Sequence, residues 1–186
     1  MQVLDQAILD WIRQYCTVDF LDAVMPWISA ICDHGEVWLL LAAGLLLQRK
    51  HRREGAAVLL ALGLDLLVCN GVVKPLAARA RPCDVNALTL LIPRPGDWSF
   101  PSGHTAASFA ATGALKACGS RLWPPAFVLA TLIAFSRLYL YVHWPSDVLA
   151  GAVLGAAVGF LADRLLRRWF PWPAEGGPER GTGRPG

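Results

Sequence analysis

The sequence predicts an all-α protein: a polytopic membrane helix bundle of about six transmembrane helices plus an N-terminal amphipathic helix. Three observations favour this fold class. Of the 186 residues, 55% are hydrophobic and only 17% are charged, whereas soluble domains average about 25% charged residues. The apolar residues form long blocks, as they do in membrane-spanning chains. The basic residues gather in connections between those blocks, where the orientation rule for membrane proteins places them.

The first three elements are an interfacial helix and two short spans. In residues 3–15 the apolar side chains fall on one helical stripe and the polar ones lie off it, which predicts a helix at the membrane interface or against the bundle. Residues 18–32, interrupted by Pro26, and residues 35–48 are expected to be the first two spans. Both are shorter than the ~20 residues that an independent span requires.

Four further spans are predicted at residues 54–77, 102–118, 122–143 and 145–168. The span at 102–118 is rich in Ala, Ser and Thr, which suits close helix packing in lipid. In the last span Gly151, Gly155 and Gly159 recur every four residues and indicate a packing face. Residues 78–101 are polar, contain four prolines and predict a long functional loop.

The domain organisation follows from composition. Residues 1–170 are expected to form one membrane-embedded domain. Residues 171–186 are polar and rich in Gly and Pro, so a disordered C-terminal tail is expected there.

Basic residues set the orientation of the chain. The clusters follow the second, fourth and sixth expected spans: Arg49, Lys50, Arg52 and Arg53; Lys116 and Arg121; Arg164, Arg167 and Arg168. All three clusters then lie on one side, which is cytoplasmic by the positive-inside rule. We therefore expect an integral protein of a bacterial inner (plasma) membrane, with residues 78–104 on the extracytoplasmic side. Arg79, Arg81 and Arg94 lie in that outer segment against the rule, which indicates another use for them.

The sequence gives little reason to expect a cofactor, a metal or a nucleic-acid partner. The five cysteines are scattered and no His or Cys pair has metal-ligand spacing. We expect these cysteines to serve as small apolar residues within helices. One disulfide bridge between Cys32 and Cys83 stays open as an alternative. The net charge of +3 does not indicate nucleic-acid binding.

Polar residues gather at the outer ends of three expected spans. They are Lys74, Arg79 and Arg81; Ser102 and His104; and Arg137, His143 and Asp147. Charge is costly near lipid, so such a group indicates function. Several cations favour an anion whose charge is spread over several oxygens, and phosphate fits best. The helix start at Ser102 and Gly103 adds free backbone N–H donors and permits close approach of a ligand.

The two histidines suggest a divided task. Asp147 follows His143 by four residues, and a carboxylate that accepts one ring N–H leaves the other nitrogen free to attack. His104 is then available as general acid towards the leaving oxygen and as base towards water. No acidic cluster is available to hold Mg²⁺, so the arginines and the lysine are expected to stabilise the transition state.

These residues resemble the three-part signature of the type 2 phosphatidic acid phosphatase superfamily, the integral-membrane lipid phosphate phosphatases. The matching segments are Lys74 to Arg81-Pro82, then Pro101-Ser102-Gly103-His104, then Ser136-Arg137 to His143 and Asp147. Every defining position matches. Each segment alone is weak, but the ordered set is highly specific.

The resemblance implies a metal-independent hydrolase without a cofactor that acts on a membrane lipid phosphate in the bilayer. It implies a phosphohistidine on His143, with Asp147 orienting the ring and His104 as acid and base. Phosphate binding would fall to Lys74, Arg81, Ser102, Gly103 and Arg137. Arg79, outside the signature, is expected to contact the headgroup. Undecaprenyl diphosphate is the favoured substrate, followed by phosphatidylglycerol phosphate or phosphatidic acid.

Several alternatives remain at this point. Taken singly, His104 is more typical of a helix cap and Lys74 of a snorkelling side chain. Vanadate-dependent haloperoxidases share the anion-binding pattern, but they are soluble and larger. A lipid phosphotransferase and a non-catalytic lipid-phosphate binder are the other classes. Asp65 and Asn70, both within an expected span, have no role in the signature.

Overall fold

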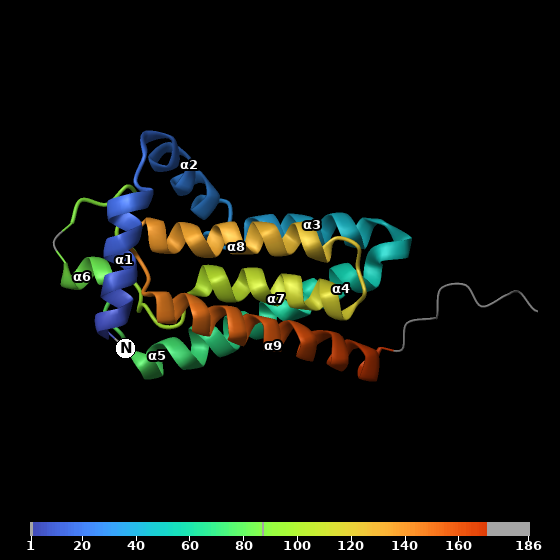
Figure 1. Ribbon diagram of the computed structural model, residues 1–186. Helices are drawn as coiled ribbons and strands as arrows, with labels where there is room; N and C mark the ends of the chain where they lie inside the picture. The colour runs from blue at the N-terminus through green and yellow to red at the C-terminus, as the bar shows by residue number, and fades with distance from the viewer. Residues whose placement is uncertain (1, 87, 171–186) are drawn as a thin grey trace, which may run out of the picture.

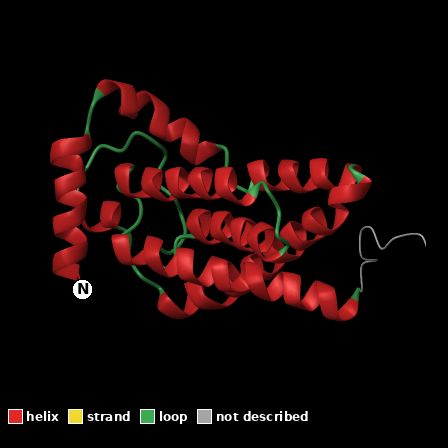
Figure 2. Ribbon diagram, turned by 45° about the vertical axis from the view of Figure 1, so that its right-hand side comes forward, coloured by secondary structure: helices red, strands yellow, loops and turns green. Residues whose placement is uncertain are grey.

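The computed structural model describes residues 2–86 and 88–170, and the regular structure in this part of the chain is entirely helical (Figure 2). The expected tail at residues 171–186 lies outside the described residues. The elements in chain order are α1 (Gln2–Cys16), α2 (Asp19–Ala30), α3 (Glu36–Leu47), η1 (Arg49–His51), α4 (Arg52–Asp65), η2 (Leu66–Val73), α5 (Lys74–Ala77), α6 (Pro82–Val85), α7 (Gly103–Ala117), α8 (Trp123–Tyr139) and α9 (Pro145–Trp169).

The body of the molecule is a bundle of α3, α4, α7, α8 and α9, with η2 and α5 continuing the line of α4 (Figure 1). The small-residue helix α7 lies at its centre and packs against α4, α8 and α9. Its Ala106, Ala110 and Ala114 are fully buried. The helices lie where the sequence places them, except that α8 ends at Tyr139 instead of residue 143. The chain turns sharply there, and Tyr141 has a φ of 60°.

Glycines allow α7 and α9 to approach each other closely, as their spacing predicted. A Cβ atom on Gly151 would lie 2.7 Å from the Ser102 carbonyl oxygen. One on Gly155 would overlap the Ala106 carbonyl, and one on Gly159 would overlap the Ala110 carbonyl. Backbone-to-backbone contact of this kind is available only where a side chain is absent.

Two helical runs are long and apolar enough to cross a bilayer, namely Arg49–Val85 and Pro145–Trp169. The bundle helices α3, α7 and α8 have 12, 15 and 17 residues, which corresponds to a rise of about 18 to 26 Å.

The helix α2 departs from the expectation that residues 18–32 form one of about six spans. It has 12 residues, and along its length it contacts one end of α8: Asp22 accepts a hydrogen bond from Tyr139, and Ser29 accepts one from Arg137. It stays at that end and does not run alongside the bundle (Figure 1). The helix α3 is equally short but packs along α4 within the bundle, so the position of α2, and not its length, sets it apart.

The helix α1 lies across the same end of the bundle (Figure 1). Leu9 is fully buried against Tyr141 and Trp144. Much of the predicted apolar stripe faces outward, with Val3, Leu4, Ile8, Trp11 and Tyr15 exposed. This arrangement fits an interfacial helix, because the outward stripe suits the boundary between headgroups and acyl chains.

Candidate active site

A cavity of about 680 Å³ lies at one end of the bundle, beside the connection between α2 and α3. The three polar segments identified in the sequence meet around it. The predicted site residues in its wall are Lys74, Arg81, Gly103, His104, Arg137 and His143. Ser102 and Asp147 lie behind this wall and do not line the cavity.

Arg81 is held rigidly beside His143. Its side chain is 2% exposed, its Nη1 donates to the Val142 carbonyl oxygen at 2.6 Å, and the same atom lies 3.1 Å from His143 Nε2. Pro82 begins α6 directly after it, and the Arg81 backbone N–H donates to Asp84 at 3.0 Å. The Arg-Pro pair of the signature thus places a guanidinium next to the expected nucleophile.

Asp97, which the sequence did not single out, bridges two of the expected phosphate-binding cations. Its Oδ1 accepts from Arg81 Nη2 at 2.6 Å, and its Oδ2 pairs with Lys74 Nζ. Burial alone raises the pKa of the Asp97 carboxyl, but the hydrogen bonds and charges of Lys74 and Arg81 outweigh it and lower the pKa to about 2. The carboxylate is therefore ionised at neutral pH. It sits where the oxygens of a phosphate would meet the same cations.

His143 lies in the turn between α8 and α9 and is 1% exposed. Its Nδ1 is 3.7 Å from Asp147 Oδ2, longer than a hydrogen bond. Burial, followed by the charges of Arg81 and Arg137, holds the pKa of the ring well below its ordinary value. The imidazole is therefore neutral at pH 7, the state that a nucleophile requires.

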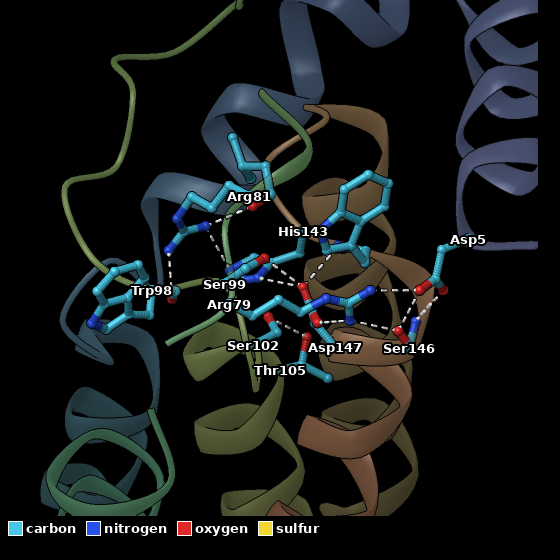
Figure 3. Close-up of polar contacts among 12 residues, drawn as sticks. Asp5, Arg79, Arg81, Trp98, Ser99, Ser102, Thr105, His143, Ser146 and Asp147 are labelled. Atoms are coloured by element: carbon cyan, nitrogen blue, oxygen red, sulfur yellow. Dashed lines mark hydrogen bonds and ion pairs between the residues drawn. The ribbon is translucent and has the colours of Figure 1, made fainter. Parts of the chain in front are cut away.

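Asp147 is fully buried, and its two oxygens are held by a network at the start of α9 (Figure 3). Oδ2 accepts from Ser99 Oγ at 2.5 Å and from the Trp144 backbone N–H at 2.9 Å. Oδ1 accepts from Arg79 Nη1 at 2.5 Å. Asp147 is the third residue of α9 and satisfies a free N–H at the helix start, a usual role for an acidic residue there.

Arg79 is not a headgroup contact as expected from the sequence. It is paired with Asp147, and it also donates to Asp5 Oδ2 at 2.7 Å and to Ser146 Oγ at 2.7 Å (Figure 3). Its guanidinium stacks over the Trp144 ring at 5.4 Å. All of these partners lie behind the cavity. Neither Asp5 nor Ser99 could be found from the sequence, because neither has a fixed spacing from the motifs.

The start of α7 contributes to the cavity through Gly103. A Cβ atom at Gly103 would lie 3.4 Å from Asn70 Oδ1 and 3.6 Å from Lys74 Nζ, which are ordinary contact distances, so Gly103 lies directly beside both side chains. Ser102, by contrast, is hydrogen-bonded to neighbouring residues of the protein. Its backbone N–H donates to the Asp147 carbonyl oxygen at 3.1 Å, and its hydroxyl accepts from Thr105 at 3.0 Å.

His104 and Arg137 face the cavity from α7 and α8. His104 Nε2 lies 2.9 Å from Oδ1 of Asp33, a residue of the α2–α3 connection that also lines the cavity. Arg137 is buried, and its Nε has no hydrogen-bond partner in the described part of the chain. A buried guanidinium with a free donor is suited to receive an anionic ligand.

The remainder of the cavity is apolar and extends between α3 and α4. Leu39, Leu59, Leu62 and Leu66 line it. Asp65 is buried in the same wall with one carboxylate oxygen unpartnered by any described residue, and Asn70 also lines the cavity. The two polar residues left without a role by the signature thus border the site. All five cysteines are free, so the bridge between Cys32 and Cys83 is not formed.

The fold and the site together define a helical membrane protein with a cavity lined by three cationic side chains and two histidines. Comparison with known proteins places it further. The PAP2 superfamily model matches residues 54–171. The undecaprenyl-diphosphatase of Sulfolobus acidocaldarius is 37% identical over 155 residues, which cover 81% of this chain and 73% of the relative.

Two further similarities agree with this match. The decaprenylphosphoryl-5-phosphoribose phosphatase of Mycobacterium tuberculosis is 36% identical over 143 residues, covering 74% of this chain and 76% of that protein. The crystal structure of a transmembrane PAP2-type phosphatidylglycerolphosphate phosphatase from Bacillus subtilis superimposes with a TM-score of 0.72 at 27% identity, covering 90% of this chain and 87% of the other. This chain belongs to the PAP2 superfamily, and it is a membrane-bound enzyme of the phosphatase class.

Proposed function

We propose that this protein is a metal-independent lipid phosphatase that removes the terminal phosphate of a membrane lipid through a phosphohistidine on His143. The observation that carries the proposal is the position of the buried His143 imidazole, whose Nε2 lies 3.1 Å from Arg81, in a cavity that His104, Lys74 and Arg137 also line. A neutral nitrogen among cations can attack a bound phosphate dianion without first losing a proton.

The reaction has two steps. In the first, His143 Nε2 forms a bond to phosphorus while the bond from phosphorus to the lipid oxygen breaks, and His104 gives its proton to that oxygen. In the second, water forms a bond to phosphorus, the phosphorus–nitrogen bond breaks, and His104 takes a proton from the water. Inorganic phosphate and the dephosphorylated lipid leave, and both histidines return to their starting states.

The cations supply the stabilisation that a metal ion supplies in other phosphoryl-transfer sites. Lys74, Arg81 and Arg137 line the cavity together with Gly103 at the start of α7. Donors fixed in advance stabilise the charge of the transition state without reorganisation. Asp147 acts on His143 by its negative charge at 3.7 Å. When the substrate binds, a small movement of the His143 ring brings its Nδ1–H to the Asp147 carboxylate.

The apolar part of the cavity supports a lipid substrate. The leucines between α3 and α4 continue directly from the cation-lined end, so a phosphate at the cations leaves the attached chain against apolar walls. Undecaprenyl diphosphate is the favoured substrate because the two curated relatives described above carry the names of polyprenyl-lipid phosphatases. Phosphatidylglycerol phosphate is the alternative supported by the Bacillus subtilis structure, and phosphatidic acid is the simplest lipid of that class.

The membrane placement belongs to the same proposal. The bundle helices α3, α4, α7, α8 and α9 cross the bilayer, while α1 and α2 stay on the side of the active site. The basic residues at 49–53, 116–121 and 164–168 lie at the opposite ends of these helices, so that end is cytoplasmic. The active site then faces the extracytoplasmic side of an inner membrane.

Phosphate release from detergent-solubilised lipids tests the mechanism. The panel contains undecaprenyl diphosphate, phosphatidylglycerol phosphate and phosphatidic acid, each assayed with EDTA. We expect full activity with EDTA, and a loss in His143→Ala of at least about 10³-fold. The variant His104→Ala is expected to accumulate an acid-labile, base-stable phosphoenzyme when given a substrate with a good leaving group. A requirement for a divalent metal, or wild-type turnover by His143→Ala, would contradict the proposal.

The same panel separates the other classes. A phosphotransferase passes the label of a radiolabelled phosphate to a second lipid instead of to water. A non-catalytic binder retains the labelled lipid unchanged, and a haloperoxidase oxidises halide only when vanadate is added.

A further inference from the structure

The connection between α2 and α3 brings a carboxylate into the site that the three signature segments do not contain. Asp33 Oδ1 lies 2.9 Å from Nε2 of His104, although the two residues are 71 positions apart. Both side chains line the cavity that holds His143, Lys74 and Arg137. His104, the expected acid and base, thus has a carboxylate partner of its own.

The backbone around Asp33 is fixed without help from its side chain. The Asp33 N–H donates to the Ala30 carbonyl oxygen at 3.2 Å, and the Gly35 N–H donates to the Cys32 carbonyl oxygen at 3.3 Å. Gly35 takes the left-handed conformation, with a φ of 79°, that turns the chain into α3. The carboxylate itself is half exposed, and His104 is its one side-chain partner in the described part of the chain. Its removal therefore leaves the turn intact.

Nε2 of His104 faces Asp33, so Nδ1 is the ring atom left for proton exchange. A carboxylate that accepts the Nε2 proton fixes the neutral tautomer with Nδ1 unprotonated, which is the form required of a base. When Nδ1 gains a proton, the same carboxylate stabilises the imidazolium, which is the form required of an acid. Held in this way, the ring also stays in one orientation towards the cavity.

We propose that Asp33 is a positioning residue that holds the His104 ring in the orientation and tautomer needed for proton transfer. This inference rests on the proposed function, in which His104 gives a proton to the leaving oxygen in the first step and takes one from water in the second. Asp33 forms no bond to substrate and exchanges no proton with it. The two proton transfers balance between Nδ1, the lipid oxygen and water.

The dependence of the rate on the leaving group tests this role. A poor alkoxide leaving group needs a proton from His104, whereas 4-nitrophenolate leaves without one. We compare kcat/KM for dioctanoyl phosphatidic acid and for 4-nitrophenyl phosphate in full-length Asp33→Asn and wild-type enzyme. The value of kcat/KM includes only the steps up to the first irreversible one. It therefore reports transfer of the phosphoryl group to His143 and not the later hydrolysis. We expect a loss of about 100-fold for the lipid and of less than about tenfold for the aryl phosphate.

Matched variants separate this role from a structural one. Asp22→Asn makes the same chemical change on α2, where the carboxylate accepts from Tyr139 and does not line the cavity. It should keep both kcat/KM values within about twofold of wild type, as expected for a residue outside a proton-transfer path. Asp33→Glu should recover part of the activity towards the lipid. Thermal unfolding of each variant in the same detergent checks that the fold is unchanged.

A double-mutant cycle with His104→Ala identifies the path of the effect. If Asp33 acts through His104, Asp33→Asn costs less than about twofold further in the His104→Ala background. Equal losses for both substrates, no loss for either, or full additivity with His104→Ala would overturn the inference.

The outcome for His104→Ala alone distinguishes failure of this inference from failure of the proposed function. If it shows the leaving-group-selective loss and Asp33→Asn does not, the role of Asp33 fails while the proposed function stands. If His104→Ala lacks that selectivity, the acid role of His104 fails and the role of Asp33 with it.

Discussion

Asp97 and Asp147 show how position decides what a carboxylate does at this site. The oxygens of Asp147 accept hydrogen bonds from Ser99, Trp144 and Arg79, which hold this carboxylate behind His143. Asp97 lies on the cavity wall and pairs with Lys74 and Arg81, the cations expected to hold phosphate. The first carboxylate is therefore a fixed part of the site. The second must share its partners when an anionic substrate enters.

Asp97→Asn is expected to strengthen product inhibition. Removal of the competing charge leaves Lys74 and Arg81 free for phosphate, so the inhibition constant of inorganic phosphate should fall about tenfold, or ~1.4 kcal/mol. Steady-state inhibition assays with phosphate and with vanadate measure this. Asp19→Asn, at the exposed start of α2, serves as the control for a charge change outside the cavity. Weaker inhibition in Asp97→Asn would mean that the carboxylate holds the cations in place instead of competing for them.

Sequence reasoning at the residue scale was strongest where spacing carried the information. It predicted Lys74, Arg81, Gly103, His104, Arg137 and His143, which the structure brings to one cavity. It did not find Asp33, Asp97 or Ser99, because loop residues have no periodic spacing that would predict their contacts. It also left the role of Arg79 open, with a headgroup contact as one use, since the sequence does not contain the distance from Arg79 to Asp5 or Asp147.

At the scale of the elements, the contact between α7 and α9 sets the geometry of the site. α7 begins with Gly103 and His104, and α9 begins two residues after His143. The glycines of α9 lie against the α7 backbone, so the two helix starts are held at a fixed separation. The four-residue glycine spacing made this packing face predictable. The end of α8 and the π-helical turn η2 were not predictable, because apolar composition does not report where a helix changes its winding.

Gly155→Ala is expected to destabilise the protein. The added Cβ overlaps the Ala106 carbonyl, and the backbone has little room to move, so overpacking should cost about 1–3 kcal/mol. Gly44→Ala on α3 is the matched control, since nothing lies within 4 Å of its added Cβ. Thermal unfolding in one detergent compares the two variants with wild type. A melting temperature for Gly155→Ala at or above that of Gly44→Ala would rule out tight packing at this position.

At the scale of the whole molecule, polar contacts join the helices at both ends of the bundle. At the end opposite the active site, Arg53 of α4 donates to Asp163 of α9 at 2.5 Å, and Arg167 of α9 donates to the Ala117 carbonyl oxygen of α7 at 2.9 Å. At the active-site end, α1 and α2 cover the bundle. The helical fold class followed from composition and block length, while the number of crossings did not. An apolar segment such as residues 18–32 has the same composition whether it spans the membrane or lies at one end.

The number of crossings has a direct test. Five crossing helices place the start of α1 and the end of α9 on opposite sides of the membrane, whereas six place them on the same side. We expect a reporter fused before α1 to be extracytoplasmic and one fused after α9 to be cytoplasmic. Paired fusions to alkaline phosphatase, active outside, and to green fluorescent protein, fluorescent inside, measure both ends. The same compartment for both ends would restore the six-span arrangement.

The contacts of Asp5 have a practical consequence. Asp5 is buried within the first turns of α1 and joins that helix to Arg79 and Ser146, immediately behind Asp147. An affinity tag or a truncation at the start of the chain therefore acts close to the pair that Arg79 forms with Asp147. Recombinant protein intended for kinetics is better tagged after α9, and preparations that differ only in their N-terminal leader should not be assumed to have the same turnover number.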